Sequence, residues 1–292
     1  MVRSEPGDRV VTDTPGGAVR QGGLSLGISP CPNDTFIFHA LAHGVTEGPT
    51  FEPPLLADVE ELNARASRGE LDVVKISLAA VAEAAAHYRL LSCGGALGRG
   101  VGPLLLTHRA RNPRRRFKTL AVPGRRTTAA LLARLMGVEG SVVELRYDEI
   151  MPALAACEVD AGVVIHEGRF TYPGFGLRLV EDLGAWWEGR FSLPLPLGVI
   201  AVRRDLGPEV AQAVAGAIRA SLRHARAHPD DSREWIAANA QELSPEVTAR
   251  HIETFVTDFS MDVGEEGRRA IELLAGRAFE AAGTAPEGGL FW

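Results

Sequence analysis

One order of secondary-structure elements occurs twice along this chain of 292 residues, and this repetition limits the possible folds more than any other feature. In the first half we expect strands at Leu24–Ile28, just before Asp58 and at Leu71–Ile76, with helices at Asp34–His43 and from Val59 to Gly69. In the second half we expect strands at Thr119–Val122, Ser141–Leu145 and Val159–Ile165, with helices at Thr127–Met136 and Ile150–Cys157. Two βαβαβ units with short connections predict an α/β fold whose mainly parallel sheets are covered by helices on both faces.

Two segments join these units and divide the chain into two lobes. The glycine-rich stretch Gly94–Val101 leads into the apolar run Leu104–Leu106, and Leu193–Val202 leads back after the second unit. We therefore expect a first lobe of residues 24–98 and 200–292 and a second lobe of residues 99–199. Beyond Arg203, the spacing of apolar residues predicts a helix through 210–222 and further helices at 231–240, 245–258 and 264–282, packed on the first lobe.

Composition excludes several classes of partner. A net charge of -6 supplies no basic field for nucleic acid. No apolar run reaches the ~20 residues of a membrane helix, and residues 1–23 form a polar, flexible extension without the apolar run of a signal peptide. The three cysteines form no CxxC pair, which fits a reducing compartment. We expect a cytoplasmic protein that binds a small molecule, as either a monomer or a homodimer.

Four short polar segments mark the expected binding site. Ligands of parallel α/β sheets bind beyond the carboxyl ends of the strands, where the N-termini of helices also point. The segments at such positions are Ser29–Thr35, Lys75–Ser77, Thr127–Thr128 and His166–Arg169. Because each predicted lobe supplies two of them, we expect them to face one another across a cleft.

Two residues in these segments have the most informative chemistry, and each has a structural alternative. Lys75 interrupts an otherwise apolar strand, so its ammonium either binds a substrate carboxylate or reaches solvent at the strand end. His166 follows an apolar strand, and an imidazole that titrates near neutrality suits a general base. A buried structural histidine is the alternative.

The remaining polar residues have weaker signals. Thr127 and Thr128 could hold a carboxylate at a helix N-terminus or simply cap that helix, and Asn33 and Asp34 could likewise be caps. The histidine pairs with i,i+4 spacing lack a third ligand or an HExxH glutamate, so we expect no metal there. Residues 94–100 lack the GK[ST] ending of a phosphate loop.

Six motifs in order resemble the 1,4-dihydroxy-6-naphthoate synthases of the futalosine route to menaquinone. They are Ser29-Pro30-Cys31-Pro32-Asn33-Asp34-Thr35-Phe36, Lys75-Ile76-Ser77, Gly94-Gly95-Ala96-Leu97-Gly98-Arg99-Gly100, Thr127-Thr128, Ile165-His166-Glu167 and Leu183-Gly184-Ala185-Trp186-Trp187-Glu188. The resemblance runs from about Leu24 to near the C-terminus.

The resemblance implies a fold similar to type II periplasmic binding proteins and a lyase that acts on cyclic dehypoxanthine futalosine. The products would be 1,4-dihydroxy-6-naphthoate and a sugar-derived fragment, with no metal or organic cofactor. His166 would be the proton acceptor. The residues expected to bind substrate are Lys75, Ile76, Ser77, Thr127 and Thr128, with Ser29, Asn33 and Arg169 as further candidates.

Two other functions fit the same pattern. A solute-binding protein would have this fold but no need for a histidine in the cleft, and a chorismate dehydratase of the same pathway would also work without a cofactor. The His-Glu and Thr-Thr motifs favour the synthase. Phe191-Ser192 and Leu78 depart from the family pattern beside the predicted cleft, so substrate packing could differ there.

Overall fold

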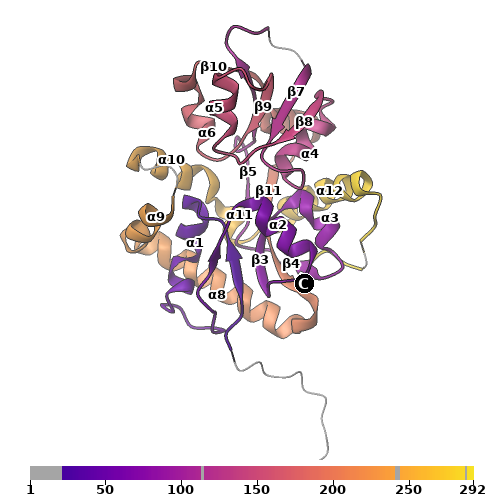
Figure 1. The fold of residues 1–292 in the computed structure, drawn as a ribbon. Helices are drawn as coiled ribbons and strands as arrows, with labels where there is room; N and C mark the ends of the chain where they lie inside the picture. Colours follow the sequence, from indigo (N-terminus) through magenta and orange to yellow (C-terminus); the bar gives the residue numbers. More distant parts are fainter. Residues whose placement is uncertain (1–21, 113–114, 241–243, 287) are drawn as a thin grey trace, which may run out of the picture.

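The molecule contains two β-sheets, one in its lower part and one in its upper part in the view of Figure 1. The computed structural model describes residues 22–112, 115–240, 244–286 and 288–292. The predicted N-terminal extension, residues 1–23, lies outside the described residues except for Gly22 and Gly23.

The first sheet has six strands with the order β2-β1-β3-β11-β4, and β5 also pairs with β11. The strands are β1 (Leu26–Ile28), β2 (Leu55–Leu56), β3 (Val73–Ser77), β4 (Tyr88–Leu90), β5 (Ala96–Gly98) and β11 (Leu195–Arg203). Strand β1 is parallel to β2 and β3. Strand β11 runs antiparallel to β3, β4 and β5.

The second sheet has five strands with the order β10-β6-β9-β7-β8. They are β6 (Leu104–His108), β7 (Arg116–Val122), β8 (Glu139–Glu144), β9 (Ala161–Val164) and β10 (Leu177–Asp182). Strand β7 is parallel to β8 and β9, whereas β6 is antiparallel to β9 and β10.

The two sheets therefore share one plan, as the repeated element order predicts. In each, the first strand of the βαβαβ unit lies between the second and the third, and an antiparallel strand from outside the unit pairs with the third. Those antiparallel strands, β11 and β6, come from the two predicted joining segments. Strand β11 begins at Leu195 and pairs only within the first sheet, so it crosses the expected boundary between residues 199 and 200.

Helices cover both faces of each sheet (Figure 1). The first unit contains α1 (Pro32–Ala42), α2 (Val59–Ser67) and α3 (Val81–Ala84), and the second contains α4 (Thr128–Leu135), α5 (Ile150–Ala155), α6 (Gly168–Thr171) and α7 (Leu183–Phe191). Short 3₁₀ turns lie at Leu78–Ala80, Tyr172–Phe175, Arg204–Leu206 and Pro229–Ser232. Helix α1 begins two residues before its predicted start, because a proline in the first turn needs no hydrogen-bond partner.

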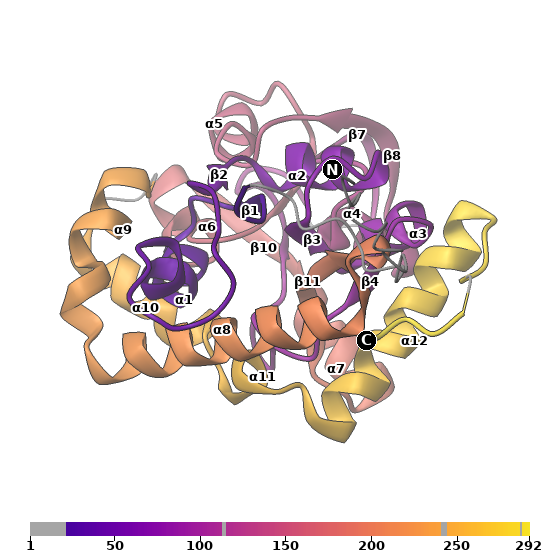
Figure 2. The same ribbon diagram turned by 90° about the horizontal axis from the view of Figure 1, so that it is seen from below.

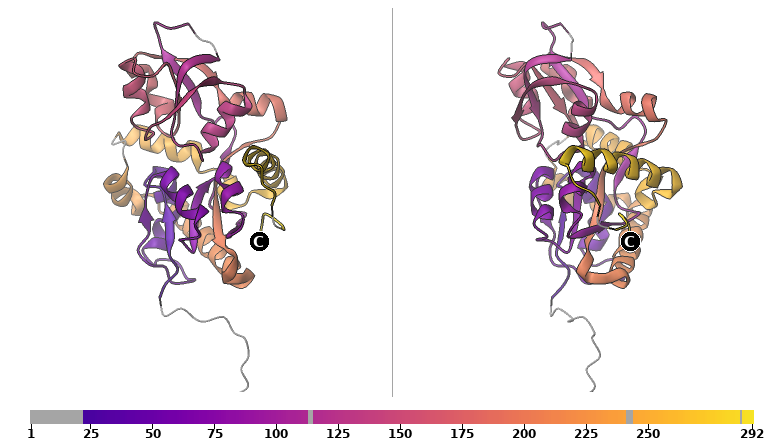
Figure 3. Two further views of the ribbon diagram at one scale, coloured as in Figure 1. Left: turned by 45° about the vertical axis from the view of Figure 1, so that its right-hand side comes forward. Right: turned by 90° about the vertical axis from the view of Figure 1, so that its right-hand side faces the viewer.

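The C-terminal third is helical, as its spacing predicts. It contains α8 (Gly207–Ala227), α9 (Arg233–Asn239), α10 (Pro245–Phe255), α11 (Asp258–Met261) and α12 (Gly264–Ala282). Helix α8 runs along the underside of the first sheet and packs on α1 (Figure 2). Helix α10 also packs on α1, whereas α12 lies at the level between the sheets, against α3 and β11 (Figure 3).

One apolar core extends from the first sheet into the second. It contains Val74 and Ala201 from the first sheet together with Leu105, Leu120 and Val163 from the second. This continuity holds the strand ends of the two sheets close together. Among the described residues, none of the helices combines the length and the apolarity that crossing a membrane requires.

Candidate active site

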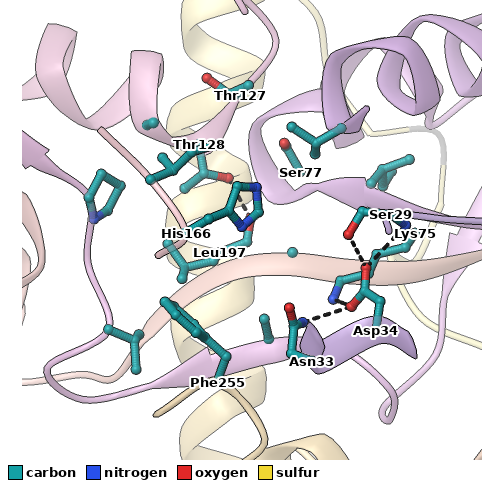
Figure 4. Close-up of a pocket in the computed structure, with 18 of the residues that line it drawn as sticks. Ser29, Asn33, Asp34, Lys75, Ser77, Thr127, Thr128, His166, Leu197 and Phe255 are labelled. Atoms are coloured by element: carbon teal, nitrogen blue, oxygen red, sulfur yellow. Dashed lines mark hydrogen bonds and ion pairs between the residues drawn. The ribbon is translucent and has the colours of Figure 1, made fainter. Parts of the chain in front are cut away.

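A cavity of about 90 Å³ lies between the carboxyl ends of the two sets of parallel strands (Figure 4). A buried water needs only about 10–15 Å³ by the same measure, so the cavity has room for several. Eight of the nine predicted site residues line it: Ser29, Asn33, Lys75, Ile76, Ser77, Thr127, Thr128 and His166. The structure thus brings all four predicted segments together, although Arg169 is not among the lining residues.

The floor of the cavity is an ionic network centred on Asp34, on the first turn of α1. Its carboxylate pairs with the Lys75 ammonium. It also accepts hydrogen bonds from Ser29 Oγ at 2.7 Å and from Asn33 Nδ2 at 2.7 Å (Figure 4). Asp34 is 1% exposed and Lys75 8%, so these two opposite charges are compensated inside the protein.

Neither of the two sequence-based alternatives for Lys75 describes it fully. Its ammonium does not reach solvent at the strand end, because it pairs with Asp34 inside the first lobe. An ammonium has three hydrogens, however, so one ion pair leaves it able to donate toward the cavity that it lines. At the end of the same strand, Ser77 Oγ accepts a hydrogen bond from Asn63 Nδ2 at 3.1 Å and keeps its own hydrogen.

The two threonine hydroxyls are engaged within the protein. Thr127 caps α4, since its Oγ1 accepts from Ala130 N at 3.2 Å, and it donates to Gly124 O at 2.7 Å. Thr128 Oγ1 donates to Leu197 O of β11 at 2.7 Å and so links the two sheets (Figure 4). The capping alternative is therefore correct for the Thr127 hydroxyl. The Ala130 N–H is taken by this cap, but Thr128 and Ala129, which also line the cavity, have no partner within the helix for their backbone N–H groups.

His166 occupies a sharp turn just beyond β9. Its φ of 55° is in the left-handed region, which costs an L-residue about 1–2 kcal/mol and is concentrated at functional sites. The ring packs edge-on against Tyr147, with centroids 4.9 Å apart, and its Nδ1 lies 3.4 Å from Cys31 Sγ. Burial raises the pKa of the Cys31 thiol, so an uncharged thiol lies beside the imidazole, with its sulfur also 3.6 Å from Nε2.

Desolvation keeps the His166 imidazole neutral. Surrounding protein atoms lower the pKa of His166 to about 4; the Asp34 carboxylate opposes this effect and the Lys75 ammonium adds to it. By surface area the side chain is only half-buried, because it faces the cavity. The ring is therefore accessible from the cavity and unprotonated at neutral pH.

Glu167 follows His166 in sequence, and its carboxylate lies beside a different histidine. Glu167 Oε2 lies 3.9 Å from Nδ1 of His251, a buried histidine on α10. The His251 ring is stacked on that of His166, with centroids 6.0 Å apart, and its Nε2 is 3.0 Å from Asn33 Oδ1. Alternation along a strand is not the reason for this arrangement, because His166 lies in the left-handed region and Glu167 begins the α6 turn.

Arg169 holds a loop and does not reach the cavity. Its guanidinium donates to Gly102 O at 2.6 Å and pairs with Asp182 at 2.7 Å. Asp182 in turn caps α7 through Gly184 N and Ala185 N. Gly102 and Gly184 touch so closely that a Cβ on Gly102 would lie 2.2 Å from the Gly184 backbone. We expected Arg169 to bind substrate, but its geometry favours a role in shaping the Gly102 edge of the cavity.

Several residues around the site carry no recognisable signal in the sequence. Cys31 lies inside a selected segment, but nothing in its type signalled contact with a histidine more than a hundred residues away. Tyr147, His251 and Phe255 reach the site only through the tertiary packing of the α5 region and α10. Within the part of the chain that the structure describes, no group of three His, Cys, Asp or Glu residues could hold a metal ion.

Known relatives match nearly the whole chain. A family model described as "Menaquinone biosynthesis" matches residues 24–280. A curated 1,4-dihydroxy-6-naphthoate synthase of Thermus thermophilus is 53% identical over 264 residues, which cover 90% of this chain and 96% of the relative. The Streptomyces coelicolor enzyme of the same name is 45% identical over 269 residues, covering 90% of this chain and 95% of the relative.

Solved structures agree on the fold. A crystal structure of an Archaeoglobus fulgidus protein superposes with a TM-score of 0.84 at 36% identity, covering 90% of this chain and 99% of that one. The periplasmic aliphatic sulphonate binding protein of Escherichia coli gives a TM-score of 0.61 at 12% identity, covering 89% of this chain and 88% of that one. The second likeness shows a periplasmic-binding-protein-like fold. The chain belongs to the menaquinone-biosynthesis family, in which its curated relatives are 1,4-dihydroxy-6-naphthoate synthases.

Proposed function

We propose that this protein is a carbon-carbon lyase that converts cyclic dehypoxanthine futalosine to 1,4-dihydroxy-6-naphthoate, with His166 as the base. The observation that carries the proposal is a neutral imidazole facing a cavity whose opposite side holds a buried ion pair with donors left for a ligand. His166 takes a proton from the carbon next to a carbonyl group of the substrate. The electron pair left on that carbon forms the new C=C bond while the bond from the neighbouring carbon to the sugar-derived fragment breaks. The fragment leaves with the electrons of that bond and takes the proton back from the His166 imidazolium, and aromatisation of the ring drives the step.

The low pKa of His166 sets a requirement for this step. An imidazole with a pKa of about 4 is unprotonated but is also a weak base, and a general base works best with a pKa near the working pH. An anionic substrate in the cavity favours the imidazolium and raises that pKa. Binding the carboxylate substrate therefore makes His166 a stronger base at the moment when a base is needed.

We propose that the substrate carboxylate binds at the start of α4. Because the Thr127 and Thr128 hydroxyls have partners, the donors would be the first backbone N–H groups of this helix, assisted by its dipole. The Lys75 ammonium and the Ser77 hydroxyl, on the opposite side of the cavity, are then placed to donate to the carbonyl oxygen as negative charge develops on it.

The sequence places the lobes at residues 24–98 with 200–292 and residues 99–199; we propose to move the second boundary so that all of β11, from Leu195 onward, belongs to the first lobe. Strand β11 supports this change, since its pairing partners are β3, β4 and β5. We also propose a cytoplasmic location, which three cysteines without disulfides support. Cell fractionation tests the location.

Turnover of the proposed substrate tests the function. The purified protein is incubated with cyclic dehypoxanthine futalosine, and 1,4-dihydroxy-6-naphthoate is followed by mass spectrometry, with His166→Ala in parallel. We expect product from the wild type and almost none from the variant. Absence of product with the wild type refutes the synthase, whereas full turnover by His166→Ala refutes only the base.

The carboxylate site has a separate test. Replacing Thr127 and Thr128 together by valine removes the cap that shapes the start of α4, so KM should rise strongly while His166 stays in place. An unchanged KM would remove this helix end from carboxylate binding. His228→Ala, on an exposed histidine of the first lobe, serves as the control for nonspecific effects.

A further inference from the structure

The hydrogen-bond chain behind His166 fixes the state of a second buried histidine. Asn33 Nδ2 donates to Asp34 Oδ1 at 2.7 Å, so the Asn33 amide is oriented with its oxygen toward His251. An amide oxygen only accepts, and His251 Nε2 lies 3.0 Å from it. His251 Nε2 must therefore carry a hydrogen.

The other nitrogen of the same ring has no hydrogen-bond partner. With the hydrogen on Nε2, a neutral His251 presents a lone pair at Nδ1, and this atom is buried without a partner among the described residues. The nearest carboxylate oxygen is Glu167 Oε2 at 3.9 Å. A carboxylate also offers only lone pairs, so this contact becomes a hydrogen bond only when one proton is present on the pair.

This contact connects the two lobes at the catalytic turn. Glu167 begins the α6 turn, where its carbonyl accepts from Phe170 N at 2.8 Å, and it is covalently next to His166. His251 belongs to α10, which packs on α1 of the first sheet. The chain from Lys75 through Asp34, Asn33 and His251 to Glu167 therefore runs from the charged floor of the cavity to the backbone that carries the base.

We propose that His251 is a positioning residue for His166 and that it acts as an Nε2-protonated imidazole sharing one proton with Glu167. With that proton, Glu167 and His251 can close their 3.9 Å separation to a hydrogen bond, which fixes the His166 turn against the first lobe. Without it, two lone pairs face each other in a desolvated place and the turn is held less firmly. The inference rests on the proposed function only in its kinetic readouts.

The surroundings of His251 favour this arrangement over an imidazolium. The charged and titratable groups that face it are His166 and Glu167 from the second lobe and Lys75, with its partner Asp34, from the first. Desolvation lowers the pKa of His251 well below its usual range, and His166 and Lys75 add to this effect. The ring itself thus stays neutral, and the shared proton belongs to the pair.

The tautomer can be measured without any substrate. Nitrogen-15 NMR of histidine-labelled protein, with His251 assigned by comparison with His251→Gln, should show a protonated Nε2 and an unprotonated Nδ1. A hydrogen on Nδ1, or a doubly protonated ring at neutral pH, would overturn the proposal.

Kinetic comparison of matched variants tests the shared proton. Glu167→Gln supplies a permanent N–H donor to His251, so we expect a kcat close to that of the wild type and the loss of one ionisation from the pH profile. Glu167→Ala and His251→Leu leave the turn unsupported, so kcat should fall about 10- to 100-fold with little change in KM. His251→Gln retains a donor for Asn33 and should recover part of the loss.

Three results would contradict the inference: Glu167→Gln as impaired as Glu167→Ala, His251→Leu equal to the wild type, or superimposable pH profiles for the wild type and Glu167→Gln. The exposed His228→Gln variant is the control and should behave as the wild type. A wild type without turnover would refute the proposed function and leave the tautomer measurement as the test of the inference.

Discussion

The two lobes have the same strand order, but the side chains at their strand ends differ in how strongly they are bonded to other groups of the protein. In the first lobe, the ends of β1 and β3 carry charged and polar side chains that bind one another: Ser29, Asn33, Asp34, Lys75 and, through Asn63, Ser77. In the second lobe, the end of β9 carries one imidazole, in a strained turn, with a weak thiol contact and an aromatic neighbour.

This difference separates two tasks that an active site must combine. A network of mutually bonded groups is rigid, because each group would lose its partners if it moved, and it can hold a substrate in a fixed place with the donors that it has left. A base must keep a lone pair available for the reacting proton, so it cannot be bonded within the protein in the same way. One lobe thus provides a fixed polar surface, and the other provides the reactive group together with the proposed carboxylate site at the start of α4.

The largest expected effect comes from His166. His166→Ala should lower kcat by about 10²- to 10⁴-fold, because it removes the general base. Its stability should change little, because the ring faces the cavity and fills no part of the core. Turnover assays with thermal unfolding measure both. A strongly destabilised variant would contradict the separation of tasks between the lobes.

In contrast to His166→Ala, Asp34→Asn should lower the stability of the protein strongly. It leaves the buried Lys75 ammonium without its counter-charge, so the free energy of unfolding should fall by about 3–5 kcal/mol. Urea denaturation measures this loss. Glu61→Gln, which breaks the exposed Glu61–Arg65 pair at 2.8 Å, should cost only about 0.3–0.5 kcal/mol. Equal losses in the two variants would mean that the Asp34 network is not the rigid part of the site.

A smaller effect is expected at the start of α4. Thr127→Val removes an N-cap hydrogen bond and should cost about 1 kcal/mol of stability, since a helix cap contributes about that much. Thermal unfolding compared with Val59→Ala, on α2 at the opposite wall of the cavity, separates loss of the cap from loss of packing. A stability equal to that of the wild type would show that the cap is replaced by another group.

The pH dependence of turnover should differ between the free enzyme and the enzyme–substrate complex. Since kcat/KM reports the free enzyme, its acid limb should lie near the His166 pKa of about 4. The acid limb of kcat should lie about one unit or more higher, because the bound anion favours the imidazolium. Coincident limbs would indicate that the substrate charge lies far from His166.

The same histidine links pH to stability. Its folded-state pKa, about 4, is below the ordinary value of 6.5, so between these values the unfolded chain binds a proton that the folded protein does not. Its effect on stability is therefore most favourable above pH 6.5 and diminishes as the pH falls toward 4. Denaturation of His166→Gln across this window should show a weaker dependence on pH than the wild type.

Strand ends could be predicted from sequence because they depend on local pattern. Apolar runs located β3 and β9, and the geometry of parallel sheets placed the residues after them at one edge, so Lys75 and His166 were correctly brought together. The joining segments were expected only to cross between the lobes, and the structure adds that they form the antiparallel strands β6 and β11. These features follow from spacing and from the common direction of the strands.

Partners could not be predicted, because they depend on side chains from distant segments. Lys75 pairs with a residue 41 positions away, and His251 reaches the site only because α10 packs on α1. Arg169 was expected in the cavity because it follows His166, but the Asp182 carboxylate draws it to a loop. The mixed pattern of β10, with half-exposed residues, gave no clear strand signal.

The way in which β11 completes the first sheet has a consequence during synthesis on the ribosome. Strands β1 to β3 emerge first. Strand β11, which pairs with the edge of β3, begins only at Leu195, after the whole second sheet has been synthesised. Residues 104–182 contain every strand of the second sheet, so that sheet can form without waiting for later residues. We therefore expect the second sheet to fold first. Until β11 is synthesised, the edge of β3 stays unpaired, and we expect this segment to depend most on chaperones.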